Sequence, residues 1–230
     1  MRHSVRLIGA AALALGTLSV GHSSPVAPAH ADTAPTVCTS SPSPSQLGDV
    51  SAHHRGDARF QVISYDKQCN ITVSAVMAVT PDLAAKYHLP AALIPSTSGV
   101  QPDSQGSGSG TCRASQTMHD VAGLVLAETD TFQPWSYNGS VITGYGQGHT
   151  GTSYSPDGWN SFNLWFNNGF AGWSAQMQFN GGATFQWLAG SFTTTMTNNG
   201  TVTRSAGCSA SFTHSATVPG GSYTQGASIQ

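Results

Sequence analysis

The chain has 230 residues, enough for one domain with a sizeable core, and it carries 8 Lys and Arg residues against 10 Asp and Glu residues. Its formal net charge is −2. The sequence therefore lacks the basic surface that nucleic acids require and that anionic membranes attract, and neither is an expected partner.

The N-terminus has the three parts of a secretion signal. Residues 1–6 are basic, residues 7–20 are apolar, and Ala29-His30-Ala31 offers a cleavage site with small residues at its first and third positions. Residues 1–31 are therefore predicted to be a bacterial-type export signal, and the mature protein is predicted to be secreted. The apolar run is too short for a membrane span, and no later stretch is long enough for one.

Four cysteines follow the signal, and an even number in an exported chain predicts disulfides. They are Cys38, Cys69, Cys112 and Cys208. Three pairings are open. We favour Cys38–Cys69, which would fasten an N-terminal arm, together with Cys112–Cys208, whose similar flanking sequences suggest neighbouring strands.

The first third of the mature chain mixes a tether, strands and a helix. Residues 32–50 contain Ser-Pro-Ser-Pro and are typical of an extended tether. The stretches 60–66 and 69–80 are rich in Val and Ile and predict a hairpin. Thr80-Pro81-Asp82 then provides an N-cap, a first-turn proline and an acidic residue for a short helix that ends before Pro90.

The middle of the chain predicts a loop followed by strands. Residues 95–111 contain Gly-Ser-Gly-Ser-Gly and predict a flexible loop. Three strands are expected after it, over residues 112–118, 121–129 and 140–145. We assign residues 51–216 to a single domain and residues 217–230, which are rich in Gly and Ser, to a disordered tail.

Residues 159–205 predict a β-meander. Apolar and polar residues alternate there, and Asn and Gly, which tolerate the positive φ of tight turns, recur in three tripeptides: Asn167-Asn168-Gly169, Asn180-Gly181-Gly182 and Asn198-Asn199-Gly200. A two-residue turn at Asn168-Gly169 and three-residue turns at the other two sites keep the faces consistent. The fold class predicted is all-β, an antiparallel β-sandwich or jelly roll, with a short helix in the N-terminal third and two disulfides.

In this register the two faces of the meander differ. The apolar face carries Phe162, Leu164, Phe166, Trp173, Met177, Phe179, Phe185 and Trp187, and the polar face carries Trp159, Asn163, Trp165, Gln176, Gln178 and Gln186. Trp165 is expected opposite Gly172, where its indole would be unobstructed. Sugar rings stack on exposed indoles while amides bond their hydroxyls, so these six residues form a candidate glycan-binding site. The alternative is that both tryptophans fill a second core.

Catalytic signals are few. Glu128, the one glutamate, and Asp130 would share a strand face about 7 Å apart, which suits a pair of catalytic acids. Glu128-Thr129-Asp130 is similar to part of the Glu-x-Asp-x-x-Glu strand of jelly-roll β-glucanases. However, Gln133 stands at the second catalytic acid, and that family is not assigned. His53 and His54 would point to opposite faces of a strand, and no metal-binding or cofactor-binding spacing is present.

The sequence favours a secreted, non-catalytic binding module for a glycan or cell-wall polysaccharide, with the cell envelope as a partner. A structural or self-associating protein of the cell surface is the first alternative, because the hydroxyl-rich strands carry little charge to oppose assembly. A glycan hydrolase that uses Glu128 with an aspartate is the second. The oligomeric state is left open.

Overall fold

A computed structural model describes residues 37–94, 106–169, 174–187 and 191–230. Strands dominate these residues, and two disulfides and one short α-helix accompany them, so the predicted fold class is confirmed. The predicted export signal and Trp173 lie outside the described residues.

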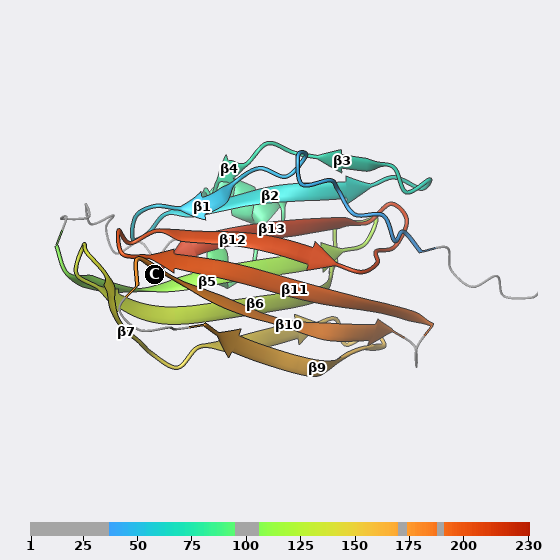
Figure 1. Cartoon of the computed structure of the whole chain (residues 1–230). Helices are drawn as coiled ribbons and strands as arrows, with labels where there is room; N and C mark the ends of the chain where they lie inside the picture. The colour runs from blue at the N-terminus through green and yellow to red at the C-terminus, as the bar shows by residue number, and fades with distance from the viewer. Residues whose placement is uncertain (1–36, 95–105, 170–173, 188–190) are drawn as a thin grey trace, which may run out of the picture. The chain divides into compact units, whose positions relative to one another are not determined.

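The strands form two antiparallel sheets (Figure 1). The five-stranded sheet has the order β1 (Val50–Ala52), β12 (Cys208–His214), β11 (Phe192–Thr203), β10 (Gln176–Trp187) and β9 (Trp159–Asn168). The eight-stranded sheet has the order β3 (Ile71–Val73), β2 (Ala58–Tyr65), β13 (Ser222–Ile229), β5 (Gly108–His119), β6 (Val125–Tyr137) and β7 (Ile142–Tyr145), while β4 (Met77–Ala78) pairs with β2 and β8 (His149–Tyr154) pairs with β6.

The disulfides are the two favoured pairs, Cys38–Cys69 and Cys112–Cys208. Cys38 is buried and its backbone forms an isolated β-bridge with Thr217, so the predicted tether is attached to the domain at this point. The reason given for the second pair was wrong, because Cys112 lies in β5 and Cys208 in β12, which belong to different sheets. This disulfide therefore joins the two layers of the sandwich.

The predicted helix is confirmed as α1 (Pro81–Lys86), with the Thr80 hydroxyl accepting a hydrogen bond from the Leu83 amide at 3.3 Å. A 3-10 turn, η1 (Ala91–Leu93), follows. Buried Phe60, Leu89 and Leu93 belong to one apolar cluster, so this helical segment covers part of the eight-stranded sheet on its outer side.

The prediction of a disordered tail was wrong, because β13 lies between β2 and β5 in the eight-stranded sheet. Tyr223 faces the interior of the sandwich, whereas Gly226 faces η1, where a β-carbon would collide with the side chain of Leu93. The strand is buried on both faces, but its residues are mostly small and polar, a composition that is also typical of disordered segments, which explains the error. Likewise, the predicted loop 95–111 overlaps β5, which begins at Gly108; residues 95–105 lie outside the described residues.

Two of the three predicted turns lie inside strands. Asn180 of β10 is directly opposite Asn199 of β11, and the pairing of these two strands continues to Trp187 and Phe192. The glycines serve close packing instead: a β-carbon on Gly200 would enter the ring of Phe179, and one on Gly181 would meet Thr131 and Thr150 of the other sheet.

The first predicted turn, at Asn168-Gly169, was wrong, because pairing with β10 continues through it: the Gly169 amide donates to the Gln178 carbonyl oxygen at 2.8 Å. Strand β9 ends at Asn168, yet this residue is opposite Phe179, so the strand that pairs with β9 begins later than expected. Residues 170–173, which include the expected partner Gly172, lie outside the described residues.

A β-bulge in β9 reverses which side chains face the core. Asn163 has φ 50°, and the pairing shifts so that two residues of β9, Asn163 and Leu164, stand against Ala183 alone. Before the bulge Trp159 faces inward, and after it Phe166 does. Phe162 and Leu164, predicted in the core, are 40% and 54% exposed.

The core is divided by a belt of buried polar residues. Gln61, Gln225, Gln116 and Thr129 lie in one cross-strand row of the eight-stranded sheet. Along β5 this row separates Ala114, in one apolar cluster, from Met118, in the other.

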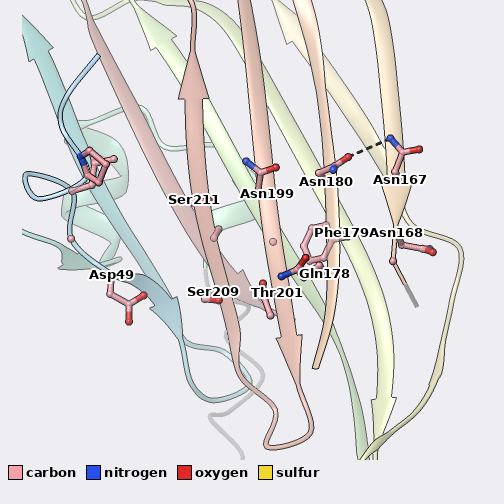
Figure 2. A pocket seen from close by; sticks show the side chains of 16 residues that line it. Asp49, Asn167, Asn168, Gln178, Phe179, Asn180, Asn199, Thr201, Ser209 and Ser211 are labelled. Carbon is pink, nitrogen blue, oxygen red and sulfur yellow. Dashed lines mark hydrogen bonds between the residues drawn. The ribbon is translucent and has the colours of Figure 1, made fainter. Parts of the chain in front are cut away.

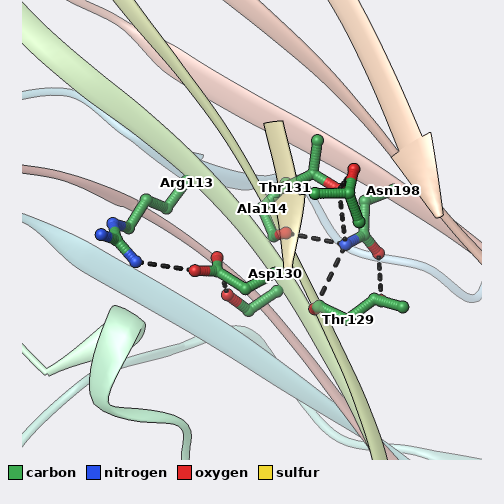
Figure 3. A network of polar contacts seen from close by, with 8 residues as sticks. Arg113, Ala114, Thr129, Asp130, Thr131 and Asn198 are labelled. Atoms are coloured by element: carbon green, nitrogen blue, oxygen red, sulfur yellow. Dashed lines mark hydrogen bonds and ion pairs between the residues drawn. The ribbon is translucent and has the colours of Figure 1, made fainter. Parts of the chain in front are cut away.

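Asn198 of β11 reaches the belt from the facing sheet. Its amide nitrogen donates to the carbonyl oxygens of Ala114 (2.8 Å) and Thr129 (3.3 Å) and to the Thr131 hydroxyl (3.2 Å), as Figure 3 shows. Its amide oxygen accepts a bond from the Thr129 hydroxyl at 3.3 Å. These bonds define how the two sheets are aligned.

Candidate functional site

The outer face of the five-stranded sheet is rich in amides and hydroxyls. Because side chains alternate along each strand, the register identifies the outward residues. They include Asn160, Phe162, Trp165 and Asn167 on β9; Gln176, Gln178, Asn180, Thr184 and Gln186 on β10; Thr193, Thr195, Thr197, Asn199, Thr201 and Thr203 on β11; and Ser209, Ser211 and Thr213 on β12.

One row of this face places three amides side by side. Asn167 is opposite Asn180, Asn180 is opposite Asn199, and Asn199 is opposite Ser211. Figure 2 shows the three asparagines on neighbouring strands, with the amide nitrogen of Asn167 donating to the side-chain oxygen of Asn180 at 3.3 Å. The next row places Gln178 opposite Thr201, and Thr201 opposite Ser209.

These two rows form the floor of a hollow of about 940 Å³. The segment before β1 contributes Pro44, Leu47, Gly48 and Asp49 to its lining. Asp49 accepts a short hydrogen bond from the Ser51 hydroxyl. The hollow therefore combines neutral donors and acceptors with one carboxylate at its side.

Trp165 lies one row away from the asparagines, opposite Gly182. A β-carbon on Gly182 would come within 2.5 Å of Cζ2 of the indole, so the ring rests against the strand, and it remains partly exposed. Trp165 therefore lies opposite a glycine, as expected, but this glycine is Gly182 and not Gly172.

Trp159 was wrongly placed on the polar face. It is 8% exposed, packs edge to face against Phe192 with ring centroids 5.6 Å apart, and belongs to the core. The bulge at Asn163 explains the error, because Trp159 and Trp165 have the same parity in sequence but point to opposite sides of the sheet.

The other predicted ligand residues are dispersed. Gln176 and Gln178 lie on the outer face, and Gln178 lines the hollow. Gln186 shares the face but lies about 27 Å from Gln178 along β10. Asn163 is exposed at the bulge. These residues therefore do not converge on one site.

The amides that line the hollow were missed because they were assigned to turns. Asn167, Asn180 and Asn199 belong to the three Asn-Gly tripeptides. Their common feature in the sequence is that each begins or centres a polar tripeptide within an alternating run. The sequence did offer one signal: if the three tripeptides are placed side by side on adjacent strands, their asparagines fall in one row.

The predicted acid pair lies on the outer side of the eight-stranded sheet. Asp130 accepts bonds from the Arg113 guanidinium at 2.6 Å and the Ser115 hydroxyl at 2.8 Å (Figure 3). Burial and the Asp130 carboxylate raise the pKa of Glu128 to about 7, although a hydrogen bond from Ser153 opposes the shift. Burial also raises the pKa of Asp130, which Arg113 opposes.

The described residues contain neither a metal site nor a membrane-spanning helix. No group of three His, Cys, Asp or Glu side chains there is arranged to hold a metal ion. In the same parts of the chain, none of the helices combines the length and apolar character that crossing a bilayer requires.

Comparison with protein-family models, with curated proteins and with solved structures finds no match to this chain.

Proposed function

We propose that this chain is a secreted, non-catalytic binding module that holds a neutral polysaccharide of the cell envelope or its surroundings on the outer face of the five-stranded sheet. The observation that carries the proposal is the cross-strand row of Asn167, Asn180, Asn199 and Ser211 on the floor of a hollow of about 940 Å³.

The chemistry of the row suits sugar hydroxyls. Each amide offers a donor and an acceptor, and a hydroxyl offers both, so neighbouring side chains can bond a ligand whose own groups do both. Trp165, partly exposed beside the row, supplies an apolar surface on which a sugar ring can stack. The predicted export signal and two disulfides support a location outside the cell.

Retention on insoluble cellulose, chitin, xylan and mannan tests the proposal. The parent protein is expected to be retained on at least one of them. Asn180→Ala and Trp165→Ala should lose retention while keeping the circular dichroism spectrum of the parent. Thr193→Ala, which alters an exposed hydroxyl of the same face outside the hollow, is the matched control and should be retained.

Two results would reject the proposal. One is a parent protein that passes through all four polysaccharides. The other is retention of both Asn180→Ala and Trp165→Ala at the level of the parent, which would place binding elsewhere on the molecule.

A second candidate function is hydrolysis of a glycan by Glu128. The observation in its favour is that burial and the Asp130 carboxylate raise the pKa of Glu128 to about 7, the range in which a carboxyl group can act as a general acid, while Asp130 beside it is paired with Arg113. Release of reducing sugar from the same four polysaccharides, lost in Glu128→Gln, would support it. Equal release by the variant would exclude it.

A further inference from the structure

A second hollow adjoins the first at the other edge of the five-stranded sheet. It has a volume of about 500 Å³ and lies over β1, the start of β12 and the hairpin between β11 and β12. Its lining includes Ser51, His53, His54, Thr203 and Ser205. Asp49 and Ser209 line both hollows, so the two share a common boundary.

The shared boundary has a simple structural origin. Ser209 of β12 is opposite Thr201 of β11 on one side and Ser51 of β1 on the other, so its side chain lies in a row that runs from one hollow into the next. Gln178 begins this row on β10. From β9 to β1 the face spans four strand intervals, or about 19 Å at the usual spacing between strands.

The charge along this path is low. Asp49 is the single carboxylate among the described residues that line either hollow, and no Lys or Arg is among them. Its neighbours are hydroxyls, amides and two imidazoles. An acidic polymer would therefore meet the Asp49 carboxylate, which has the same charge, where the two hollows join, and no Lys or Arg among the described lining residues would offset the repulsion.

We infer that the two hollows form one continuous track for a linear, neutral polysaccharide, which lies across the strands from β9 to β1 and passes Asp49 at the junction. The inference rests on the proposed function and adds the shape of the ligand, its direction and its charge. Binding energy should then accumulate along the chain, since each strand that the ligand crosses adds hydroxyl or amide partners.

Calorimetric titration with cello-, chito- and xylo-oligosaccharides of increasing length tests the track. For the series whose polymer retains the protein, affinity should rise until the oligosaccharide spans about 19 Å, the width of four strand intervals, and then level off. An oligosaccharide with the same backbone but oxidised to uronic acids should bind more weakly at every length.

The second hollow is tested with a bulky residue. Ser205→Trp, at an exposed position that lines the second hollow and not the first, should weaken binding of the longest oligosaccharide on the order of tenfold and leave the shortest nearly unchanged, because it obstructs the path without entering the first hollow. Thr213→Trp, on the outer face of the same sheet but outside both hollows, is the matched control and should bind like the parent.

The outcomes separate the two proposals. If no oligosaccharide of any length binds and no polymer retains the protein, the proposed function fails. If short oligosaccharides bind as tightly as long ones, or if Ser205→Trp leaves the longest unaffected, the first hollow is a self-contained site and the continuous track is overturned.

Discussion

The indole of Trp165 rests on Gly182, where a β-carbon would come within 2.5 Å of the ring and would also meet the carbonyl oxygen of Met196. The glycine thus allows the aromatic ring to lie against the sheet beside the row of asparagines.

Gly182→Ala should destabilise the protein by about 1–3 kcal/mol, because the methyl group must displace the indole or the neighbouring strand. Urea unfolding measures the change. Gly144→Ala is the matched control, since a β-carbon there has open space around it, and its effect should be within about 0.5 kcal/mol. Equal costs for the two substitutions would contradict the packing described for Trp165.

The two tryptophans of β9 should differ in their contribution to stability. Trp159→Ala removes a core side chain and should cost about 3–5 kcal/mol. Trp165→Ala removes a partly exposed ring and should cost about 1–2 kcal/mol. Denaturant titration of both variants measures the two losses in the free energy of unfolding and so checks the reversal of faces at the bulge. A larger loss of stability from Trp165→Ala than from Trp159→Ala would show that the bulge is misplaced.

Asn198 and Asn199 are consecutive residues with opposite roles. Asn198→Ala leaves buried carbonyl and hydroxyl groups without their partner and should cost about 3 kcal/mol. Asn199→Ala should change stability by about 0.5 kcal/mol or less but should weaken retention on the polysaccharide. Unfolding and retention assays on both variants give the comparison, which fails if the two losses of stability are alike.

Glu128 should make the protein less stable as pH rises. Its folded pKa, about 7, is above its ordinary value of 4.5, so its contribution is fully present below pH 4.5 and is lost as pH rises through 7. Glu128→Gln should therefore exceed the parent in stability at pH 8 by on the order of 2 kcal/mol. Thermal unfolding from pH 5 to pH 8 measures this, with Asp157→Asn, an exposed residue outside the cluster, as the control.

His214 should act in the opposite direction. It stacks on Tyr223 and lies 2.6 Å from the Tyr65 hydroxyl, and burial lowers its pKa to about 4 from 6.5. Its contribution is therefore present above pH 6.5 and is lost as pH falls through 4. Burial lowers the pKa of His119 similarly, so His214→Gln should reduce the acid-induced loss by about half. An unchanged slope in denaturation curves between pH 7 and pH 4 would count against this assignment.

Local signals in the sequence predicted the fold class and the helix cap at Thr80, because strand alternation and capping depend on neighbouring residues. The pair Cys112–Cys208 was predicted correctly but for the wrong reason, since the two cysteines lie in different sheets. That Gly181 and Gly200 lie inside strands and not in turns was not predictable in the same way, since a glycine that permits positive φ and one that admits a neighbouring side chain look identical in sequence. The prediction for Trp159 failed because a bulge at Asn163 adds a single position to β9 and exchanges the faces on either side of it.

Strand β13 has a consequence for how the chain is made. It lies between β2 and β5, so one side of β2 and one side of β5 have no partner until Ser222–Ile229 has been synthesised. Until then both β2 and β5 present an open edge to the surroundings, and such edges recruit other chains. The eight-stranded sheet can therefore close only once β13 is available to join its two parts.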